Sequence, residues 1–304
     1  MNSKILIAVV GPTAIGKTSL GILLAKHFET EILSADSRQF FKEMEIGTAV
    51  PSRQELRQVP HHFIQHKSIF DPYSVGDFVN DAQHLLDGLF QRKDVILMVG
   101  GSGLYVDAVI KGLDEFPDVD PTLRKTLNSK LKEEGLQGLQ KELQERDPAY
   151  YSVVDLENPH RLIRALEVSI TANRPYSSFL NQKKSKRPFN HFYVGIEAPR
   201  ATLYERINTR VDLMMNAGLL EEAKRLHVHK NLNALKTVGY KELFEYLDGV
   251  CSLEEAVSEI KKNTRRFAKR QLTWLRKNKS ILWVGHDEEP EEILKKVLEQ
   301  IKTS

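Results

Sequence analysis

The stretch from Ile5 to Phe28, "ILIAVVGPTAIGKTSLGILLAKHF", decides the fold. A short apolar run leads into "GPTAIGKT" and then into a segment whose leucines recur at helical spacing. Four residues match the pattern G-x-x-x-x-G-K-[ST] in full: Gly11, Gly16, Lys17 and Thr18. Loops of this kind point backbone N–H groups at phosphate oxygens, at the positive end of the following helix. The stretch therefore predicts a phosphate-binding strand, loop and helix.

All eight residues of the loop are predicted to surround phosphate: Gly11, Pro12, Thr13, Ala14, Ile15, Gly16, Lys17 and Thr18. The lysine would add a positive charge beside the terminal phosphate, and the Thr18 hydroxyl is the expected ligand of Mg²⁺. A chance match in a helix-capping turn is the alternative. The apolar run before the loop and the helical pattern after it argue against that alternative.

Further apolar runs predict a parallel sheet covered by helices, which is an α/β fold. We expect strands at Ile5–Val10, Glu31–Ala35, Val95–Val99 and Phe192–Ala198, and an edge strand at "ILWVG". From about residue 114 the pattern becomes helical. "DPTLRKTLNSKLKEEG" and "NPHRLIRALEVSITANRP" each have a proline at the first helical position. Residues 114–190 are therefore predicted to form an all-helical insertion, and residues 1–113 and 191–304 the P-loop core.

The composition is that of an ordinary globular protein. Of 304 residues, 41% are apolar and 28% are charged, and the net charge is +3. The single cysteine excludes an intramolecular disulfide and a multi-cysteine zinc site, and it suits a reducing cytosol. The apolar run before Gly11 is too short for the core of a signal peptide, and no run is long enough to span a bilayer. We therefore expect a cytoplasmic protein with no membrane partner.

The strand ends near the loop disfavour a nucleoside triphosphatase. The run "DVILMVGGSG" ends in glycines and Ser102, where such enzymes normally carry a Walker-B aspartate. A small-molecule kinase stays open. Asp36, in "LSADSRQFF", is the acid closest to the loop at a strand end, where ligands of parallel sheets bind. It is either a general base or an acid that caps a turn.

Eight segments together resemble the bacterial tRNA dimethylallyltransferases, also called tRNA isopentenyltransferases. They are "GPTAIGKTSL", "SADSRQFFKEMEIGTAVP", "VPHHFI", "DPYSVGDF", "VGGSGLY", "NPHRLIRALEV", "TVGYKEL" and "RRFAKRQLTWLR". They keep their order from residue 5 to about residue 277. No single segment besides the phosphate loop is diagnostic, but eight in register are specific.

The resemblance implies that the loop holds the diphosphate of dimethylallyl diphosphate. The N6 amine of an adenine beside the anticodon attacks the allylic carbon, and diphosphate leaves. Asp36 would take the proton of that amine, and the Ser102 hydroxyl, where many relatives have threonine, would bond to substrate. Arg210 would neutralise the diphosphate, although Arg206, one helical turn away, is the alternative.

A basic segment near the end of the chain predicts contact with RNA. Lys261–Lys279 holds nine Lys or Arg and no acid. As a helix it separates an apolar side (Phe267, Ala268, Leu272 and Leu275) from cationic sides (Arg265, Arg266, Lys269 and Arg270). Such a run either neutralises phosphates or is a solvated face whose cations suit the helix dipole.

The resemblance adds further residues to the expected contact with the anticodon stem-loop. These are Asp36, Ser37, Arg38, Gln39 and Ser102 beside the loop, Arg124, His160, Arg161 and Arg164 in the insertion, and Lys236, Gly239, Tyr240 and Lys241 in "KTVGYK". Tyr240 is either a stacking ring or a core aromatic. The pairs His61 with His62 and His227 with His229 lack a closed ligand set, so we expect packing or surface roles.

The sequence thus predicts a monomeric, Mg²⁺-dependent prenyltransferase that modifies tRNA. The first alternative is a P-loop kinase of the nucleoside or shikimate type. The second is an RNA-binding module with a decayed loop, which the intact Lys17, Thr18 and Asp36 disfavour.

Overall fold

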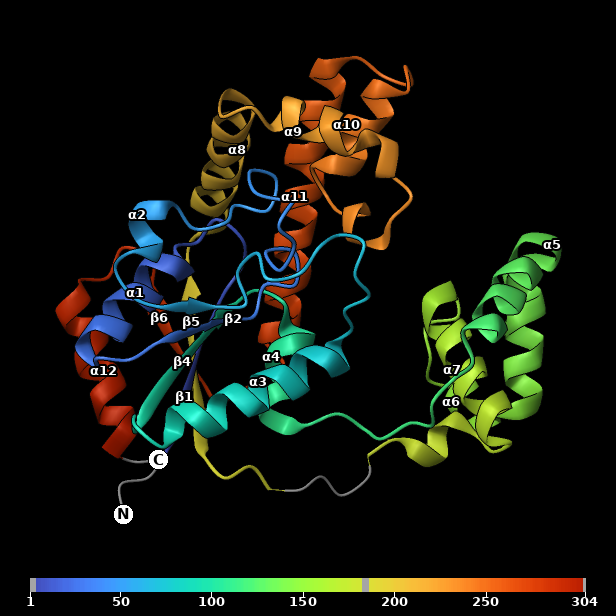
Figure 1. The fold of residues 1–304 in the computed structure, drawn as a ribbon, viewed down its shortest axis with the longest axis horizontal. Helices are drawn as coiled ribbons and strands as arrows, with labels where there is room; N and C mark the ends of the chain where they lie inside the picture. Colours follow the sequence, from blue (N-terminus) through green and yellow to red (C-terminus); the bar gives the residue numbers. More distant parts are fainter. Residues whose placement is uncertain (1–3, 182–185, 303–304) are drawn as a thin grey trace. The chain divides into compact units, whose positions relative to one another are not determined.

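A parallel sheet forms the centre of the larger of two units (Figure 1). The structure is a computed structural model that describes residues 4–181 and 186–302. Within these residues the sheet has six strands in the order β3-β2-β4-β1-β5-β6. The strands are β1 (Ile5–Val10), β2 (Ile32–Ser34), β3 (His61–His62), β4 (Val95–Gly100), β5 (Asn190–Glu197) and β6 (Ile281–Gly285). All neighbouring pairs are parallel, so the predicted α/β class is confirmed.

The strand that precedes the loop lies inside the sheet. All six residues of β1 are buried between β4 and β5, which explains why its sequence is continuously apolar rather than alternating. The edge strand β6 was predicted, whereas β3 was not. β3 has two residues, both histidine, and so carries no apolar pattern that could announce it.

Helices cover both faces of this sheet. In Figure 1, α1 (Lys17–His27) and α12 (Pro290–Lys302) lie on one side, and α3 (Val75–Phe90) and α4 (Gly103–Lys111) on the other. Buried side chains of α1, α12 and α8 (Arg200–Asn216) share one apolar cluster with β1 and β5. The sheet therefore exposes the carboxyl ends of its strands, not its faces, to a ligand.

The rest of the larger unit is helical. It contains α2 (Arg53–Leu56), α9 (Leu219–Leu226), α10 (Tyr240–Leu247) and α11 (Leu253–Leu275), with short 3₁₀ turns η2 (His227–His229) and η3 (Asn233–Leu235). No helix among the described residues has the length and apolar character needed to cross a membrane.

The second unit, Gly112–Lys186, is the helical insertion. It contains α5 (Pro121–Arg146), α6 (Pro148–Tyr151), α7 (Pro159–Ala172) and η1 (Tyr176–Phe179). Asn158 caps α7 by accepting the Arg161 N–H, and proline follows at the first helical position. Leucines of α5 and α7 form a core of its own, so this unit has independent packing.

Candidate active site

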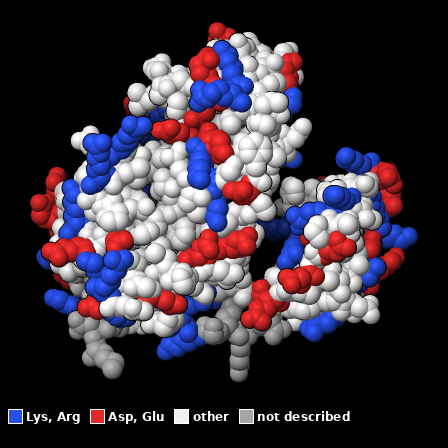
Figure 2. Space-filling model, viewed as in Figure 1, with Lys and Arg blue, Asp and Glu red and all other residues white. Residues whose placement is uncertain are grey.

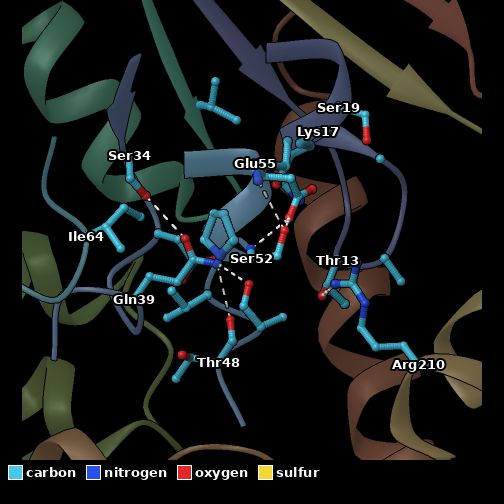
Figure 3. A pocket seen from close by; sticks show the side chains of 18 of the residues that line it. Thr13, Lys17, Ser19, Ser34, Gln39, Thr48, Ser52, Glu55, Ile64 and Arg210 are labelled. Carbon is cyan, nitrogen blue, oxygen red and sulfur yellow. Dashed lines mark hydrogen bonds between the residues drawn. The ribbon is translucent and has the colours of Figure 1, made fainter. Parts of the chain in front are cut away.

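A cavity of about 660 Å³ opens at the carboxyl ends of β1, β2 and β4. Its walls come from the loop before α1 and the start of that helix, the ends of β2 and β4 and the residues after β2, the segment 45–55, and one face of α8, with His61 and Ile64 beside them. Figure 3 shows side chains from these elements converging on the same space. This is the place where open parallel sheets bind their ligands.

The predicted phosphate loop forms one wall of this cavity. Gly16 has φ +111°, which favours glycine, and α1 starts at the next residue. The first turn of α1 therefore directs N–H groups without intrahelical acceptors at the cavity. Of the eight predicted residues, those from Thr13 to Thr18 line the cavity. Gly11 and Pro12 are buried behind it and do not line it.

Gln271 of α11 fastens the loop from behind. Its side-chain oxygen accepts the Thr13 N–H at 2.9 Å, and its side-chain nitrogen donates to the Gly101 carbonyl at 2.9 Å. The Thr13 N–H is thus bonded to Gln271 in this structure, while the residue still lines the cavity as predicted. Sequence reasoning missed Gln271, yet its position among Ala268, Leu272 and Leu275 on the apolar side of the helix was a usable signal.

Three cationic side chains line the same cavity: Lys17, Arg206 and Arg210. Desolvation by burial lowers the pKa of Lys17 to about 8, Asp36 opposes this effect, and Arg210 adds to it. Burial also lowers the pKa of Arg210, with Arg206 contributing. These shifts mean that the cavity holds positive charge at an energetic cost, which a bound anion would relieve.

The two arginines differ in their contacts. Arg206 donates from Nε to the carbonyl of Ala14 at 2.9 Å, and Ala14 has a positive φ of 67°. Among the described residues, Arg210 makes one long hydrogen bond, of 3.5 Å to the Thr13 hydroxyl, and Figure 3 shows it reaching toward that residue. Arg206 is therefore tied to the loop, while the guanidinium of Arg210 is nearly uncommitted.

Asp36 follows β2 and lines the cavity. Its Oδ1 accepts the Arg38 N–H at 3.1 Å, so the carboxylate also closes a turn. The two interpretations from the sequence are thus compatible. Ser102 is not among the lining residues. Its hydroxyl accepts the Ser37 N–H at 3.1 Å and so holds the turn that carries Asp36.

The segment 45–55 closes the cavity opposite the loop, and sequence analysis did not assign it to the site. Gln39 donates to the carbonyls of Thr48 and Ala49 at 3.2 and 2.9 Å. Ser52 and Glu55 form a capping box at the start of α2. Figure 3 shows these contacts around the cavity. Gln39 therefore acts here as a brace for the wall.

Comparison with known proteins shows the family of the chain. Residues 39–278 match the profile described as IPP transferase. The chain belongs to the IPP transferase family. It is 58% identical to the tRNA dimethylallyltransferase of Christiangramia forsetii (99% of this chain, 100% of the relative). It is 52% identical to that of Flavobacterium johnsoniae (99% of each chain). The crystal structure of the tRNA isopentenylpyrophosphate transferase from Bacillus halodurans superposes with a TM-score of 0.74 at 36% identity, covering 99% and 97% of the two chains.

Two predicted RNA contacts, Gly239 and Tyr240, lie inside the protein, and a third, Arg38, is half-buried. Tyr240 is fully buried, and its hydroxyl donates to Glu222 at 2.6 Å, so the ring is a core aromatic and direct stacking on a nucleotide is excluded. Gly239 is buried beside it, with φ +99° at the start of α10. Arg38 is half-buried and donates to the carbonyls of Asn233 and Ala234 at 3.2 and 2.9 Å. Its guanidinium holds η3.

Other predicted contacts in the core are on the surface. Lys236 and Lys241 are exposed at the two ends of "KTVGYK". In the basic half of α11, Lys269 and Arg270 are exposed, and Arg265 is half-buried and donates to Asn208 at 2.7 Å. Phe267 was expected on the apolar side of the helix, but its side chain is 39% exposed. The guanidinium of Arg270 lies over its ring.

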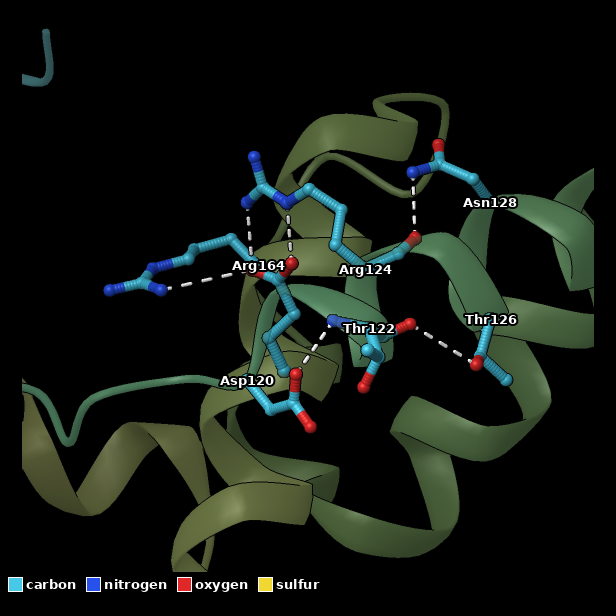
Figure 4. Close-up of polar contacts among 7 residues, drawn as sticks. Asp120, Thr122, Arg124, Thr126, Asn128 and Arg164 are labelled. Atoms are coloured by element: carbon cyan, nitrogen blue, oxygen red, sulfur yellow. Dashed lines mark hydrogen bonds and ion pairs between the residues drawn. The ribbon is translucent and has the colours of Figure 1, made fainter. Parts of the chain in front are cut away.

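The insertion unit presents arginines arranged around one acid (Figure 4). Arg124 donates from two nitrogens to the carboxylate of Glu167, which is buried, and Arg164 lies 3.7 Å from the same group. His160 and Arg161 are exposed on the first turn of α7. Figure 2 shows Lys and Arg interspersed with Asp and Glu on the visible surface of each unit, without one continuous basic band. On this face, contact with RNA would therefore depend on particular side chains.

The histidine pairs have ordinary partners. His61 Nδ1 bonds to the Val59 carbonyl at 2.9 Å, and His62 pairs with Glu31 at 2.7 Å. His227 pairs with Asp248 at 2.9 Å. Within the described residues no group of three or more His, Cys, Asp or Glu is arranged to hold a metal ion. The side chains with oxygen donors that line the cavity include Thr18, Ser19, Asp36 and Glu55.

Proposed function

We propose that this protein transfers the dimethylallyl group of dimethylallyl diphosphate to the N6 amine of the adenine beside the anticodon of tRNA. The observation that carries the proposal is the cavity itself, in which Lys17, Arg206 and Arg210 face the same space as Asp36. A diphosphate and an attacking amine need opposite charges in close reach, and this cavity supplies both. The family to which the chain belongs supports the same activity.

The reaction forms one bond and breaks another. The N6 lone pair attacks the allylic carbon, and the bond from that carbon to the diphosphate oxygen breaks. Asp36 accepts the proton that leaves N6, which keeps the product amine neutral. Lys17 and Arg210 offset the charge that grows on the departing diphosphate. No water has to be activated in this transfer, because the nucleophile is the amine itself.

Mg²⁺ is the cofactor we propose for the departing diphosphate. Thr18 would hold it, and the hard oxygen donors of the cavity suit this ion, which binds through a few protein oxygens, waters and phosphate. The ion would supply additional neutralisation of the leaving group. The mildly basic chain, exposed Lys236 and Lys241, and the arginines of the insertion support tRNA as the acceptor. We further propose that the protein acts in the cytoplasm as a monomer.

Label transfer tests the proposal directly. Purified protein is incubated with Mg²⁺ and an anticodon stem-loop, with labelled dimethylallyl diphosphate in one reaction and γ-labelled ATP in another. We expect label to enter RNA from the allylic donor only, and Asp36→Asn to abolish this transfer. Label released from ATP without an RNA product would overturn the proposal in favour of a kinase.

A further inference from the structure

Glu222 of α9 is a buried carboxylate that the chemistry above does not use. It is 2% exposed, and it is not among the residues that line the cavity. It lies one turn after Gly218, which has a φ of +100° and precedes the first residue of α9. A buried charge of this kind is costly unless its partners satisfy it. Its partners therefore indicate what it does.

Four donors converge on this one carboxylate. Oε2 accepts the N–H groups of Glu45 and Ile46 at 3.1 and 2.9 Å. Oε1 accepts the Gly47 N–H at 2.9 Å and the Tyr240 hydroxyl at 2.6 Å. Three consecutive backbone amides pointing at one acid define a turn that the acid holds in place. Burial and the adjacent carboxylate both raise the pKa of Tyr240, so its phenol stays protonated and donates.

The turn that Glu222 holds is part of the cavity wall. Glu45 and Ile46 line the cavity, and so do the following residues from Thr48 to Ser52. Gly47 packs closely against Tyr240, since a Cβ at that position would lie 2.6 Å from the ring, so a larger residue does not fit there unless the ring moves. From the other side, Gln39 holds the carbonyls of Thr48 and Ala49. The wall is thus held from two directions. Hydrogen bonds within the segment also brace its first half, and the Glu222 carboxylate accepts the three backbone amides of residues 45–47.

We propose that Glu222 is a positioning residue for the allylic donor, because it sets the shape of the cavity by holding the 45–47 turn. Tyr240 supports this role by donating a hydrogen bond to the Glu222 carboxylate. This inference rests on the proposed function, because it assigns the cavity to that donor. It predicts a defect mainly in donor binding and donor choice. The RNA acceptor enters the cavity with its target adenine and takes the rest of its affinity from other surfaces, so its binding should change much less than that of the donor.

Glu222→Gln is the decisive variant. Glutamine keeps the size of the side chain, but its NH₂ group faces donors, so at least one amide of the turn loses its acceptor. We expect KM for dimethylallyl diphosphate to rise about tenfold, with kcat reduced less and KM for the stem-loop changed much less. We also expect weaker discrimination against geranyl diphosphate, which has a longer chain, because a loosened wall excludes it less well. Tyr240→Phe, which removes one of four donors, should give a smaller change in the same direction.

Glu242→Gln is the matched control. Glu242 is a buried carboxylate too, but it accepts from Gly239 and Asn263 at 2.8 Å each and makes no contact with the turn. We expect it to lower the melting temperature, as Glu222→Gln does, while leaving donor KM and donor choice unchanged. Binding of a thiolodiphosphate analogue of the donor, measured by calorimetry, gives the same comparison without turnover.

Each outcome decides one question. If wild type transfers dimethylallyl groups and folded Glu222→Gln keeps its donor KM and its discrimination, the positioning role is wrong and the proposed function stands. If both glutamate variants change donor KM equally, a general loss of stability explains the effect and the positioning role is again wrong. If wild type transfers no label, the proposed function itself fails.

Discussion

The cavity after β1 and the arginine cluster of the insertion unit both gather positive charge. The cavity leaves most of this charge without a carboxylate partner at bonding distance, whereas the insertion pairs it with a buried carboxylate. In the cavity, burial lowers the pKa of Lys17 and Arg210, and their contacts are to a carbonyl and a hydroxyl. In the insertion, hydrogen bonding to Glu167 raises the pKa of Arg124, which is largely exposed. The first arrangement stores unneutralised charge for a small anion that can enter a cavity. The second neutralises much of its charge internally and fixes the direction of its arginines.

This difference predicts where a lost cation costs most. A preorganised charge in a desolvated site contributes far more than the same charge in water, because no reorganisation is needed when the anion forms. An exposed charge acts on RNA through counterion release, and each such contact is worth much less. Substitutions in the cavity should therefore reduce the rate, and substitutions in the insertion should reduce affinity and its salt dependence.

The largest effect is expected for Lys17→Met. Loss of this buried charge should lower kcat for transfer about 10²–10³-fold, as removal of one preorganised donor does elsewhere. Single-turnover transfer of labelled dimethylallyl groups measures it. Lys26→Met is the control on the same helix, since Lys26 bonds to Gln58 at the far end of α1 and should be neutral. Activity of Lys17→Met within threefold of wild type would remove this lysine from the site.

Arg210→Gln and Arg206→Gln should distinguish the arginine that binds the diphosphate from the one that holds the loop, which the sequence could not do. Arg210 is nearly uncommitted, so its loss should lower kcat/KM for the donor by about 10–100-fold without lowering the melting temperature. Arg206 holds the Ala14 carbonyl, so its loss should also lower the melting temperature. Kinetics and thermal melting of both variants measure the two effects. The assignment is reversed if Arg210→Gln destabilises the fold and Arg206→Gln does not.

Donor affinity should depend on pH through Lys17. Its pKa of about 8 means that it is charged below pH 8 and loses its proton above it. A bound diphosphate favours the charged form, so affinity should be constant below pH 8 and fall up to about tenfold per pH unit above it. Calorimetric titration with the donor between pH 6.5 and 9.5 measures this. Lys17→Met should bind weakly and lack this pH dependence, and an unchanged slope in that variant would assign the titration to another group.

The same shift has a consequence for stability with the opposite sign. The folded pKa lies below the ordinary 10.5, so between pH 8 and 10.5 the unfolded chain binds more protons than the folded one. The folded state is therefore penalised below pH 8, and the penalty disappears as the pH approaches 10.5. Lys17→Met should raise the melting temperature at pH 7, and this gain should shrink at pH 10.

The contrast between the two regions also shows what the sequence could reveal. The phosphate loop was predictable because its chemistry lies within eight consecutive residues between an apolar strand and a helix. The insertion was predictable from its caps and prolines, and Gly135, where the first predicted helix stops, does have non-helical angles within α5. Patterns that are local in sequence were therefore sufficient for the core strands and for most helix ends.

Interactions between distant residues were not predictable. Arg38 bonds to carbonyls almost 200 positions away, and no local pattern tells such an arginine from one that meets RNA. Tyr240 lies in a segment with exposed lysines, but it is buried because its hydroxyl donates to Glu222 and its ring packs against Gly47. β3 forms because it pairs with β2, not because of its own residues. The wall of the cavity depends on contacts of this kind.

The smallest effect is expected in the insertion, where Arg124 and Arg161 offer a direct comparison. Arg161 is exposed and has no carboxylate partner among the described residues, so Arg161→Gln should weaken stem-loop binding several-fold and reduce the slope of log K against log salt by about 0.7–0.9. Arg124 already shares its charge with Glu167, so Arg124→Gln should change the slope less. It should instead lower the melting temperature, because a buried carboxylate loses its bidentate partner.

Fluorescence anisotropy of a labelled stem-loop at several salt concentrations, with thermal melting of both variants, measures the comparison. Because the slope counts phosphates neutralised, it separates a cation that meets RNA from one that only orients its neighbours. Equal slopes for the two variants, both lower than that of wild type, would show that Arg124 contacts RNA while it is paired with Glu167. Slopes equal to that of wild type in both would move the RNA contact off this cluster and leave it to the cations of α11 and the Lys236–Lys241 segment.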